Sequence, residues 1–403
     1  MYQGRKLLPA GKGKDELFKT CFACHGFETR MASVTRDEDG WRDRIQYMRE
    51  AMHFFIRDRF SDQNADEVAA YLNSVFGPDS ILPKSAADAP GYKETVRSFT
   101  PGAMNMVYVE YELPGPNRMP WSAAPDKDGN LWIPYYGRAN MIGRLNPVTA
   151  EVKEFPVPNE GTAAIHSAVA GPDGAVWLAE QGSQKLGRWD PVTQKITEYQ
   201  DTIGKHTIRV SPSGEIFFSG GKGSFDPKTQ TFTHYEGGAY GIALDKDGNV
   251  WYAAGNDLVR VDGKTHAVSK YTPPTHDNNF NRRIQVDSDG MVWFAEFNHG
   301  IMTSFDPKTE KFREYQLPGP EASPYALGID KDHYIWYSSE YMDVIGRMDP
   351  KTGNVVEYPF PQSENTMREF FYDAQSGRMW FGSPANNKVG YFYLAGNSAR
   401  GGN

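Results

Sequence analysis

The chain has 403 residues, a length that suits two or more domains. Aromatic residues make up 13% of it, and its 40 glycines and 27 prolines favour many short strands and turns over long helices. The net charge of −8 argues against a nucleic-acid surface, and no apolar run reaches the ~18 residues of a membrane span.

A C-x-x-C-H run near the start is the strongest chemical signal in the chain. It comprises Cys21, Cys24 and His25, with the spacing that attaches a c-type haem. Each thiol can form a thioether with one porphyrin, and His25 then supplies the proximal iron ligand. No other cysteine exists, so a structural zinc site with four ligands is disfavoured. We predict one covalent haem c, bound through these three residues.

Three stretches around this motif have helical patterns. Residues 14–20 precede it, and residues 37–58 carry apolar side chains at helical spacing. A third helix is expected to begin after Ser61 and to end at Gly77. Short helices around one haem are the arrangement of the cytochrome c family, which residues 1–78 resemble. We therefore predict a small all-α haem domain.

The sixth iron ligand has several candidates. Met48 follows Trp41 by seven residues, an arrangement similar to cytochrome domains that take their distal ligand from such a helix. Met31 and Met52 offer the same thioether, whereas His53 would give bis-histidine ligation and a lower potential. Met48 is the preferred candidate, so His25 and Met48 are the predicted iron ligands.

Two further expectations concern the linker and the location of the protein. Residues 79–104 are rich in proline, alanine and serine and lack a periodic pattern, which predicts a linker. The first residues carry no apolar targeting segment. Because c-type haem is normally attached outside the bacterial cytoplasm, we expect a periplasmic protein whose export signal has been removed.

The rest of the chain, residues 105–396, is a seven-fold repeat. Each unit has an apolar strand, a tight turn of the Asp-Gly type and a second strand that opens on an aromatic residue. Two more strands follow, usually around an Asx-Pro turn. Four strands every ~40–45 residues predict a seven-bladed β-propeller. The recurring aromatic residues are Trp132, Trp177, Phe217, Trp251, Trp293, Trp336 and Trp380.

The last repeat lacks its fourth strand. Residues 106–112, which precede the first repeat, match the fourth-strand pattern. We predict that they pair with the last blade and close the ring, since closure removes exposed sheet edges. Residues 397–403 are then a short tail.

Parts of the repeat resemble the streptogramin lyase (virginiamycin B lyase) family of propellers. The resemblance covers about residues 106–396 and is carried best by the segments 143–147 and 346–350, which read Gly-Arg-(Leu/Met)-(Asn/Asp)-Pro. It implies a lyase that uses histidine and glutamate at one end of the axis for proton abstraction. Glu296 matches the family's Trp-Phe-x-Glu piece, and His299 is the nearest histidine in the sequence.

The register of the repeat predicts which residues line the propeller axis. Seven positions before each turn, or eight in the last unit, whose turn has one extra residue, every residue is aromatic, imidazole or guanidinium: Trp121, His166, His206, Tyr240, Arg282, Tyr325 and Arg368. A second predicted ring ends each second strand and contains Tyr135, Glu180, Gly220, Ala254, Glu296, Ser339 and Ser383. Histidine can act as a general base and arginine can bind an anionic oxygen. The candidate catalytic residues are His166, His206, Glu180, Glu296, Arg282 and Arg368.

Three functions fit this sequence. The first is a periplasmic oxidoreductase that binds a small anionic or aromatic substrate at the axis and passes electrons through the haem to an external redox protein. The second is a streptogramin-lyase-like C–O or C–N lyase with an accessory cytochrome domain. The third is a non-enzymatic electron-transfer or binding module. Two histidines with Glu180 also offer ligands for an additional metal ion in the axial funnel.

Overall fold

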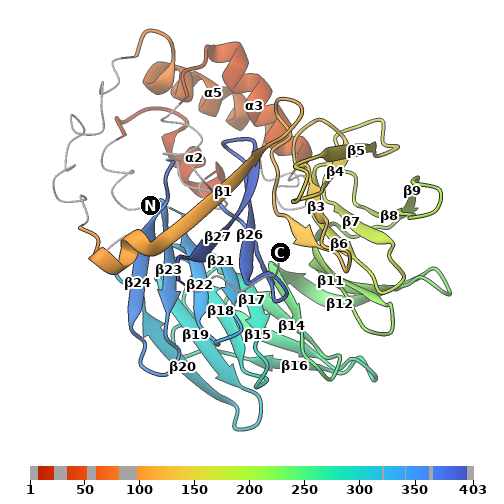
Figure 1. The fold of residues 1–403 in the computed structure, drawn as a ribbon. Coiled ribbons are helices and arrows are strands. Elements are labelled where there is room, and N and C mark those ends of the chain that lie inside the picture. Colours follow the sequence, from red (N-terminus) through yellow and green to blue (C-terminus); the bar gives the residue numbers. More distant parts are fainter. Residues whose placement is uncertain are drawn as a thin grey trace.

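The computed structural model describes residues 8–21, 34–51, 60–80, 98–319, 322–340, 342–362 and 366–396. The chain forms a helical unit followed by a β-propeller (Figure 1). Among the described helices, none combines the length and the apolar character that a membrane crossing requires.

The described part of the helical unit contains three α-helices: α2 (Lys14–Thr20), α3 (Glu38–Ala51) and α5 (Asp62–Phe76). The Ser61 side chain caps α5 by accepting a hydrogen bond from the backbone N–H of Asn64, as the serine before the apolar stripe predicts. The helices share one apolar core that includes Leu17, Trp41 and Leu72. The three predicted helices are confirmed within the described residues, whereas residues 52–58 of the second lie outside them and the cytochrome c fold stays a prediction. Most of the predicted linker lies outside the described residues, and its end forms the 3₁₀-helix η5 (Pro101–Asn105).

Seven sheets form the propeller. Blades 1 to 3 contain β2 (Ala124–Pro125), β3 (Leu131–Pro134), β4 (Met141–Leu145), β5 (Val152–Pro156), β6 (Ile165–Ala170), β7 (Val176–Glu180), β8 (Lys185–Trp189), β9 (Ile196–Gln200), β10 (Lys205–Val210), β11 (Ile216–Asp226) and β12 (Thr231–Ala239). Blades 4 and 5 contain β13 (Gly241–Leu244), β14 (Val250–Ala254), β15 (Asp257–Val261), β16 (Val268–Tyr271), β17 (Asn281–Val286), β18 (Val292–Glu296), β19 (Ile301–Asp306) and β20 (Lys311–Gln316). Blades 6 and 7 contain β21 (Pro324–Ile329), β22 (Ile335–Ser339), β23 (Val344–Met348), β24 (Val355–Pro359), β25 (Phe370–Asp373), β26 (Arg378–Ser383) and β27 (Lys388–Leu394).

The ring is closed by a strand from the other end of the propeller sequence. Strand β1 (Met106–Glu112) pairs antiparallel with β27, from Met106 opposite Leu394 to Glu112 opposite Lys388. Blade 7 therefore has the order β1-β27-β26-β25, and β1 is the orange strand that crosses the blue blade in Figure 1. This is the position that the sequence pattern of residues 106–112 assigns to the strand.

The first strands of neighbouring blades contact one another, so they surround the axis. Blade 3 departs from the four-strand expectation, because its sheet contains β10, β11 and β12 only. The first part of β11 pairs with β10 and its second part with β12. Gly221 permits this course, since a Cβ there would lie 1.8 Å from the Ile203 side chain.

A carboxylate at the start of the tight turn explains the recurring tryptophan. In four blades one carboxylate oxygen caps the turn by accepting backbone N–H groups, and the other accepts the indole N–H at 2.8 to 3.1 Å. The pairs are Asp126 with Trp132, Asp245 with Trp251, Asp287 with Trp293 and Asp330 with Trp336. This aspartate lies two positions before the first residue of the tight Asp-Gly turn, as Asp126 does before Asp128, and it joins the turn to the core.

We expect Asp245→Ala to lower the free energy of unfolding by about 1–3 kcal/mol, because it leaves buried donors without an acceptor. Asp245 accepts hydrogen bonds from the backbone N–H groups of Asp247 and Asn249 and from the Asn249 and Trp251 side chains. The matched control is Asp247→Ala, since that exposed side chain bonds Lys246 only; we expect a change within about 0.5 kcal/mol. Urea unfolding checks both, and equal losses would contradict the assigned role.

Candidate functional site

The seven residues predicted for the axis come together in the structure and form one connected set, the axial ring. All seven are buried, and Trp121 is the most exposed at 8%. Four members lie where the first strand of their blade has an irregular register, at the start of β6, β10, β17 and β21. A bulge re-aims side chains, so these irregularities turn the ring residues toward the axis.

Each member of the axial ring contacts its neighbours. Trp121 donates its indole N–H to Nε2 of His166 at 2.6 Å, and the imidazoles of His166 and His206 lie 3.6 Å apart between centroids. The His206 ring lies 4.1 Å from that of Tyr240, whose hydroxyl is hydrogen-bonded to the Tyr325 hydroxyl. The guanidinium of Arg368 then lies 4.3 Å from the Tyr325 ring and 5.4 Å from the Trp121 ring, which completes the circuit.

Arg282 is enclosed by aromatic side chains. Its guanidinium carbon lies 3.7 Å from the ring centroid of Phe280, 4.3 Å from that of Phe297 and 4.7 Å from those of Tyr240 and Tyr325. Such contacts stabilise a cation through the negative face of each ring, most strongly where water is excluded. The side chain is 0% exposed, so its charge is held inside the propeller.

A second set of charged side chains, Arg283, Arg209 and Glu369, connects blades that are not neighbours. Arg283 donates through Nη1 to Thr207 at 2.5 Å and through Nε to the backbone oxygen of Arg368 at 2.7 Å. Glu369 accepts from Arg209 at 2.7 Å, and although burial opposes it, Arg283 and Arg209 lower the pKa of Glu369. These contacts join blades 3, 5 and 7 below the axial ring.

Four charged or polar residues near the axis are not among the residues predicted for it: Arg283, Thr207, Arg209 and Glu340. Arg283 and Thr207 directly follow ring residues, so simple strand alternation assigns them to the other face of the strand. The register irregularity that brings consecutive residues to the axis leaves no clear signal in the sequence. Glu340 forms a bidentate ion pair with Arg368, at 2.6 and 2.8 Å.

Both ring histidines are held in the neutral form. The pKa of His166 lies well below its usual value because of burial, with further contributions from His206 and the arginines. Burial and the charges of Arg283 and Arg282 depress the pKa of His206 in the same direction. The arginines Arg282, Arg283 and Arg368 therefore disfavour a further positive charge on either imidazole.

The hydrogen-bonding state of His166 follows from its partner. Because Nε2 accepts the indole N–H, a neutral imidazole carries its proton on Nδ1. Nδ1 is buried and has no hydrogen-bond partner within the described part of the chain, and the same holds for the hydroxyls of Ser122 and Ser167. Buried polar groups of this kind indicate water or a ligand at the axis.

The structure does not bring Glu180 and Glu296 to the histidines, contrary to the expected funnel. Glu180 accepts from Ser183 at 2.8 Å, and a Cβ on Gly187 would lie 2.5 Å from its Oε1, so the carboxyl group lies against the outer strands of blade 2. Glu296 accepts from Thr303 of β19 at 2.5 Å in the same way. Residues 176, 178 and 180 share one side of β7, and that side packs on blade 1.

Burial determines the protonation of both carboxyl groups. It raises the pKa of Glu180 to about 8, with the charge of Glu198 adding to the effect. It raises the pKa of Glu296 to about 7, with a smaller contribution from Glu314. His299, the histidine nearest to Glu296 in sequence, is an exposed residue whose Nε2 bonds the backbone oxygen of Asp277 at 2.7 Å. The structure thus does not form the predicted histidine–glutamate pair.

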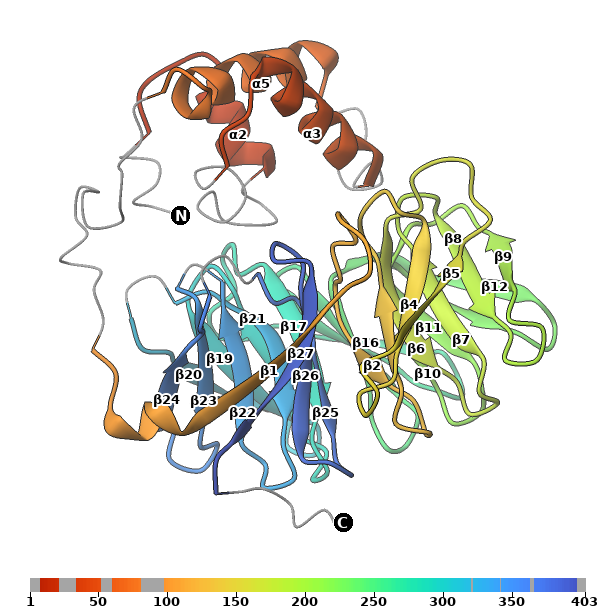
Figure 2. The same cartoon turned by 45° about the horizontal axis from the view of Figure 1, so that its top comes forward.

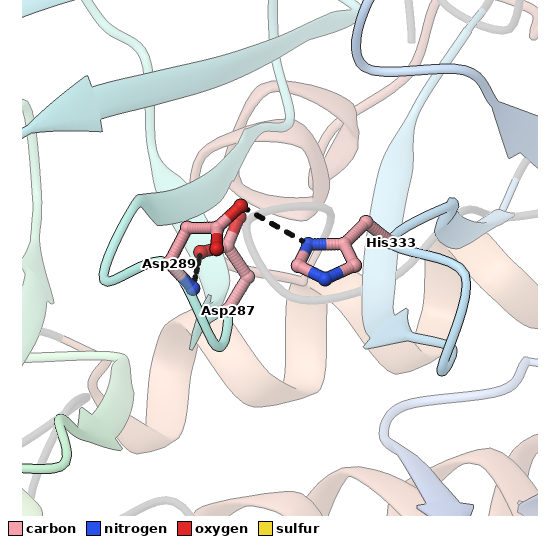
Figure 3. Close-up of side chains that lie close together, drawn as sticks. All are labelled: Asp287, Asp289 and His333. Atoms are coloured by element: carbon pink, nitrogen blue, oxygen red, sulfur yellow. Dashed lines mark hydrogen bonds and ion pairs between the residues drawn. The ribbon is translucent and has the colours of Figure 1, made fainter.

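The predicted metal site of His166, His206 and Glu180 is not assembled among the described residues. The group there whose ligand atoms lie within 4.8 Å of one another is Asp287, Asp289 and His333 (Figure 3). Both Asp287 oxygens already accept hydrogen bonds within the turn and from Trp293. His333 bonds Ser288 at 3.0 Å. This group therefore belongs to a surface turn, at the opposite end of the strands from the axial ring.

The haem residues are described only in part. Cys21 follows α2 and is half-buried against the helical core, and Met48 lies half-buried on α3. A thiol at the end of α2 and a thioether on α3 suit covalent attachment and axial ligation of a haem. Cys24, His25, Met31, Met52 and His53 lie outside the described residues. The haem therefore remains a prediction from the C-x-x-C-H run.

Comparisons with known proteins agree on the propeller. Residues 227–400, less than half of the chain, match the sequence profile of the Virginiamycin B lyase family. The structure is similar to virginiamycin B lyase from Staphylococcus aureus, with a TM-score of 0.66 and 22% identity over 72% of this chain and 99% of that one. A comparison with curated protein sequences gives no match.

Two further structures are similar over most of the propeller. One is a catalytically inactive histidine-to-alanine variant of the S. aureus lyase with quinupristin, with a TM-score of 0.64 and 23% identity over 72% of this chain and 99% of that one. The other is hydrazine synthase from Kuenenia stuttgartiensis, with a TM-score of 0.57 and 14% identity over 69% of this chain and 96% of that one. At these identities the comparisons establish a virginiamycin B lyase-like seven-bladed propeller and nothing finer.

We expect Glu180→Gln to remove a pH dependence of stability. The pKa of Glu180 is about 8 in the folded chain against 4.5 in the unfolded one, so the folded state holds more protons between these values. Stability should fall as the pH rises through this window, by up to about 1.4 kcal/mol per pH unit, and the variant should lose that slope. Urea unfolding at pH 5 to 8 measures this.

The matched control is Glu310→Gln, at an exposed turn position whose counterparts in blades 2 and 3 are Gln194 and Gln230. Its pH profile should run parallel to that of the unmodified chain. A Glu180→Gln profile that also runs parallel would show that Glu180 ionises normally.

Proposed function

We propose that the propeller binds a small anionic molecule at the axial ring and that a ring histidine exchanges a proton with it, as an elimination reaction requires. The observation that carries this proposal is the pair of buried, neutral imidazoles, His166 and His206, in the positive field of buried arginines. A neutral imidazole has a lone pair for a proton, and the arginines stabilise the negative charge left behind.

The two histidines suit different roles. Nε2 of His166 is engaged by the indole N–H of Trp121, so His166 offers a donor, Nδ1–H, to an anionic oxygen. His206 bonds the Thr207 hydroxyl through Nδ1 at 2.9 Å, and Thr207 in turn accepts from Arg283. Because His166 is the donor, we take His206, which Thr207 orients through Nδ1, as our candidate for the proton acceptor.

The similarity to virginiamycin B lyase supports lyase-type chemistry, and the inactive histidine-to-alanine variant shows that the relative depends on a histidine. The arrangement proposed for this chain differs in detail. Its ring histidines precede residues 227–400, the segment that matches the family, and Glu296 contacts β19 instead of the ring. We therefore assign the proton transfer to histidine, with arginine in place of glutamate as its partner.

We expect acetate, benzoate and 3-hydroxybutyrate to bind the chain, and His166→Gln, which removes the Nδ1–H donor, to weaken that binding by roughly tenfold or more, since a lost hydrogen bond to a charged group costs about 1.5–3 kcal/mol. Calorimetry measures binding, and proton NMR of 3-hydroxybutyrate in D₂O detects exchange at the α-carbon or loss of water. The control is His276→Gln, in an outer loop. Binding without exchange would favour a binding module, and no binding by any probe would contradict the proposal.

A second function is favoured by the C-x-x-C-H run and by the position of the helical unit. We infer that residues 1–78 carry one haem c and exchange electrons with an external redox protein. Helix α3, which carries Met48, packs against ring residue Trp121, so a haem unit would lie beside the proposed ligand site. When bound, the haem would supply one-electron chemistry, while the chain holds the iron through His25 and Met48. Covalent haem attachment also supports the proposed periplasmic location.

We expect the chain to show a Soret band when it is made in a host that matures c-type cytochromes, and Cys21→Ala with Cys24→Ala to abolish covalent attachment. Met48→Ala should remove the far-red absorption of a methionine–iron bond, whereas Met52→Ala and His53→Ala should keep it. Visible spectra and a denaturing gel stained for haem check these outcomes. A colourless chain would contradict the second function and leave the first untouched.

A further inference from the structure

Helix α3 and the propeller share one buried cluster at the mouth of the axis, the docking cluster. Figure 2 shows the helices over one end of the blades. On the α3 side the half-buried Met48 packs against it. An apolar centre of this kind is typical of a specific interface rather than a flexible tether. The docking cluster consists of Tyr47, Ala51, Met119, Trp121, Tyr136 and Ala164.

Polar contacts surround the docking cluster. Arg138 forms an ion pair with Asp43 at 2.8 Å, and both side chains are largely exposed. Thr162 donates to Glu50 at 2.8 Å. Exposed pairs of this kind contribute little to stability, so the apolar centre determines how α3 sits on the propeller.

Trp121 belongs to both the axial ring and the docking cluster. Its indole N–H bonds Nε2 of His166, and its ring stacks on Tyr136 with centroids 4.3 Å apart and planes at 28°. Tyr136 in turn meets the edge of Tyr47 on α3 at 6.4 Å, and the Tyr47 hydroxyl donates to the Tyr136 backbone oxygen. A continuous series of contacts thus runs from α3 to His166.

We propose that Trp121 is a positioning residue that couples the axial ring to helix α3. Its hydrogen bond keeps His166 in the tautomer that presents Nδ1–H to a ligand, and its stack on Tyr136 keeps α3 docked. The indole is rigid, so a shift that breaks the bond to His166 also disturbs the stack. Coupling between two sites is reciprocal: a ligand at the ring alters the surroundings of Met48, and a change at α3 alters His166.

This coupling goes beyond the proposed functions, because it requires neither an elimination nor a haem. Where the second function also holds, the coupling makes the reduction potential of the haem depend on the state of the ring. The effect on the reduction potential requires a bound haem, whereas the effect on the His166 tautomer does not. The tautomer ratio therefore tests the coupling, and the reduction potential tests its link to the haem.

The first experiment follows the tautomer of His166 by ¹⁵N NMR of the full chain labelled at its nine histidines, with His166→Gln used to assign the signal. Tyr47→Ala, which removes the α3 side of the contact, should change the tautomer ratio about fivefold, the low end of usual coupling factors. In a Trp121→Phe background the same Tyr47→Ala change should have no effect. The matched control is Asp43→Ala, which removes an exposed contact of the same interface and should leave the ratio unchanged.

An unchanged ratio in Tyr47→Ala, or an equal change in Asp43→Ala, would overturn the proposal. If Trp121→Phe does not fold, Tyr136→Leu tests the same route, because it removes the stack and leaves the indole bond to His166 in place.

The second experiment compares the reduction potential of the haem-loaded chain with that of His166→Gln, with and without Trp121→Phe. We expect His166→Gln to shift the reduction potential, and Trp121→Phe to abolish that shift. If the tautomer ratio changes but the potential does not, the link to the haem is refuted, while the coupling between α3 and His166 still holds.

Discussion

The pairing of β1 with β27 is the constraint on which the rest of the structure depends. Strand β1 supplies the closing strand from the segment before blade 1, and hydrogen bonds from Asn387 of blade 7 to the backbone of Gly115 and Arg118 reinforce the same junction. Closure fixes the radius of the ring of first strands. It therefore brings Trp121 in blade 1 against Arg368 in blade 7, although 247 positions separate them in the sequence. Without closure the axial ring would be an arc open at this point.

Charge at the centre of such a ring is costly, and the way it is accommodated determines the chemistry. Arg368 has Glu340, Arg283 and Arg209 share Glu369, and Arg282 lies among aromatic faces. Buried ions are tolerated where partners and hydrogen bonds replace water. The ring histidines contribute no charge, because burial and these cations depress their pKa values. This combination of buried arginines and neutral imidazoles is what supports the proposed anion binding and proton transfer.

The sequence was sufficient for features that depend on periodicity. The number of blades, the closing strand and the seven positions of the axial ring all follow from a repeat whose register can be counted. Features that depend on a break in periodicity were missed or misplaced. Arg283 reaches the axis only because the register of β17 is irregular between Asn281 and Ile284. Glu180 was placed at the axis from its position in the repeat, whereas strand alternation turns its side chain toward blade 1 and the outer strands.

Contacts between the two units could not be predicted from either pattern alone. Tyr47 lies outside the stripe of Trp41 and Ile45 that packs in the helical core, and Tyr136 comes two residues after the end of β3, so neither periodic pattern assigns it a partner. Their contact gives Trp121 a second neighbour besides His166. An elimination at the axis requires no electron acceptor and therefore no haem. A haem unit attached only through its linker would then have no influence on the reaction at the axis. A helix docked through the same tryptophan that bonds His166 is not independent of the axis, so this contact would connect the two proposed functions if both hold.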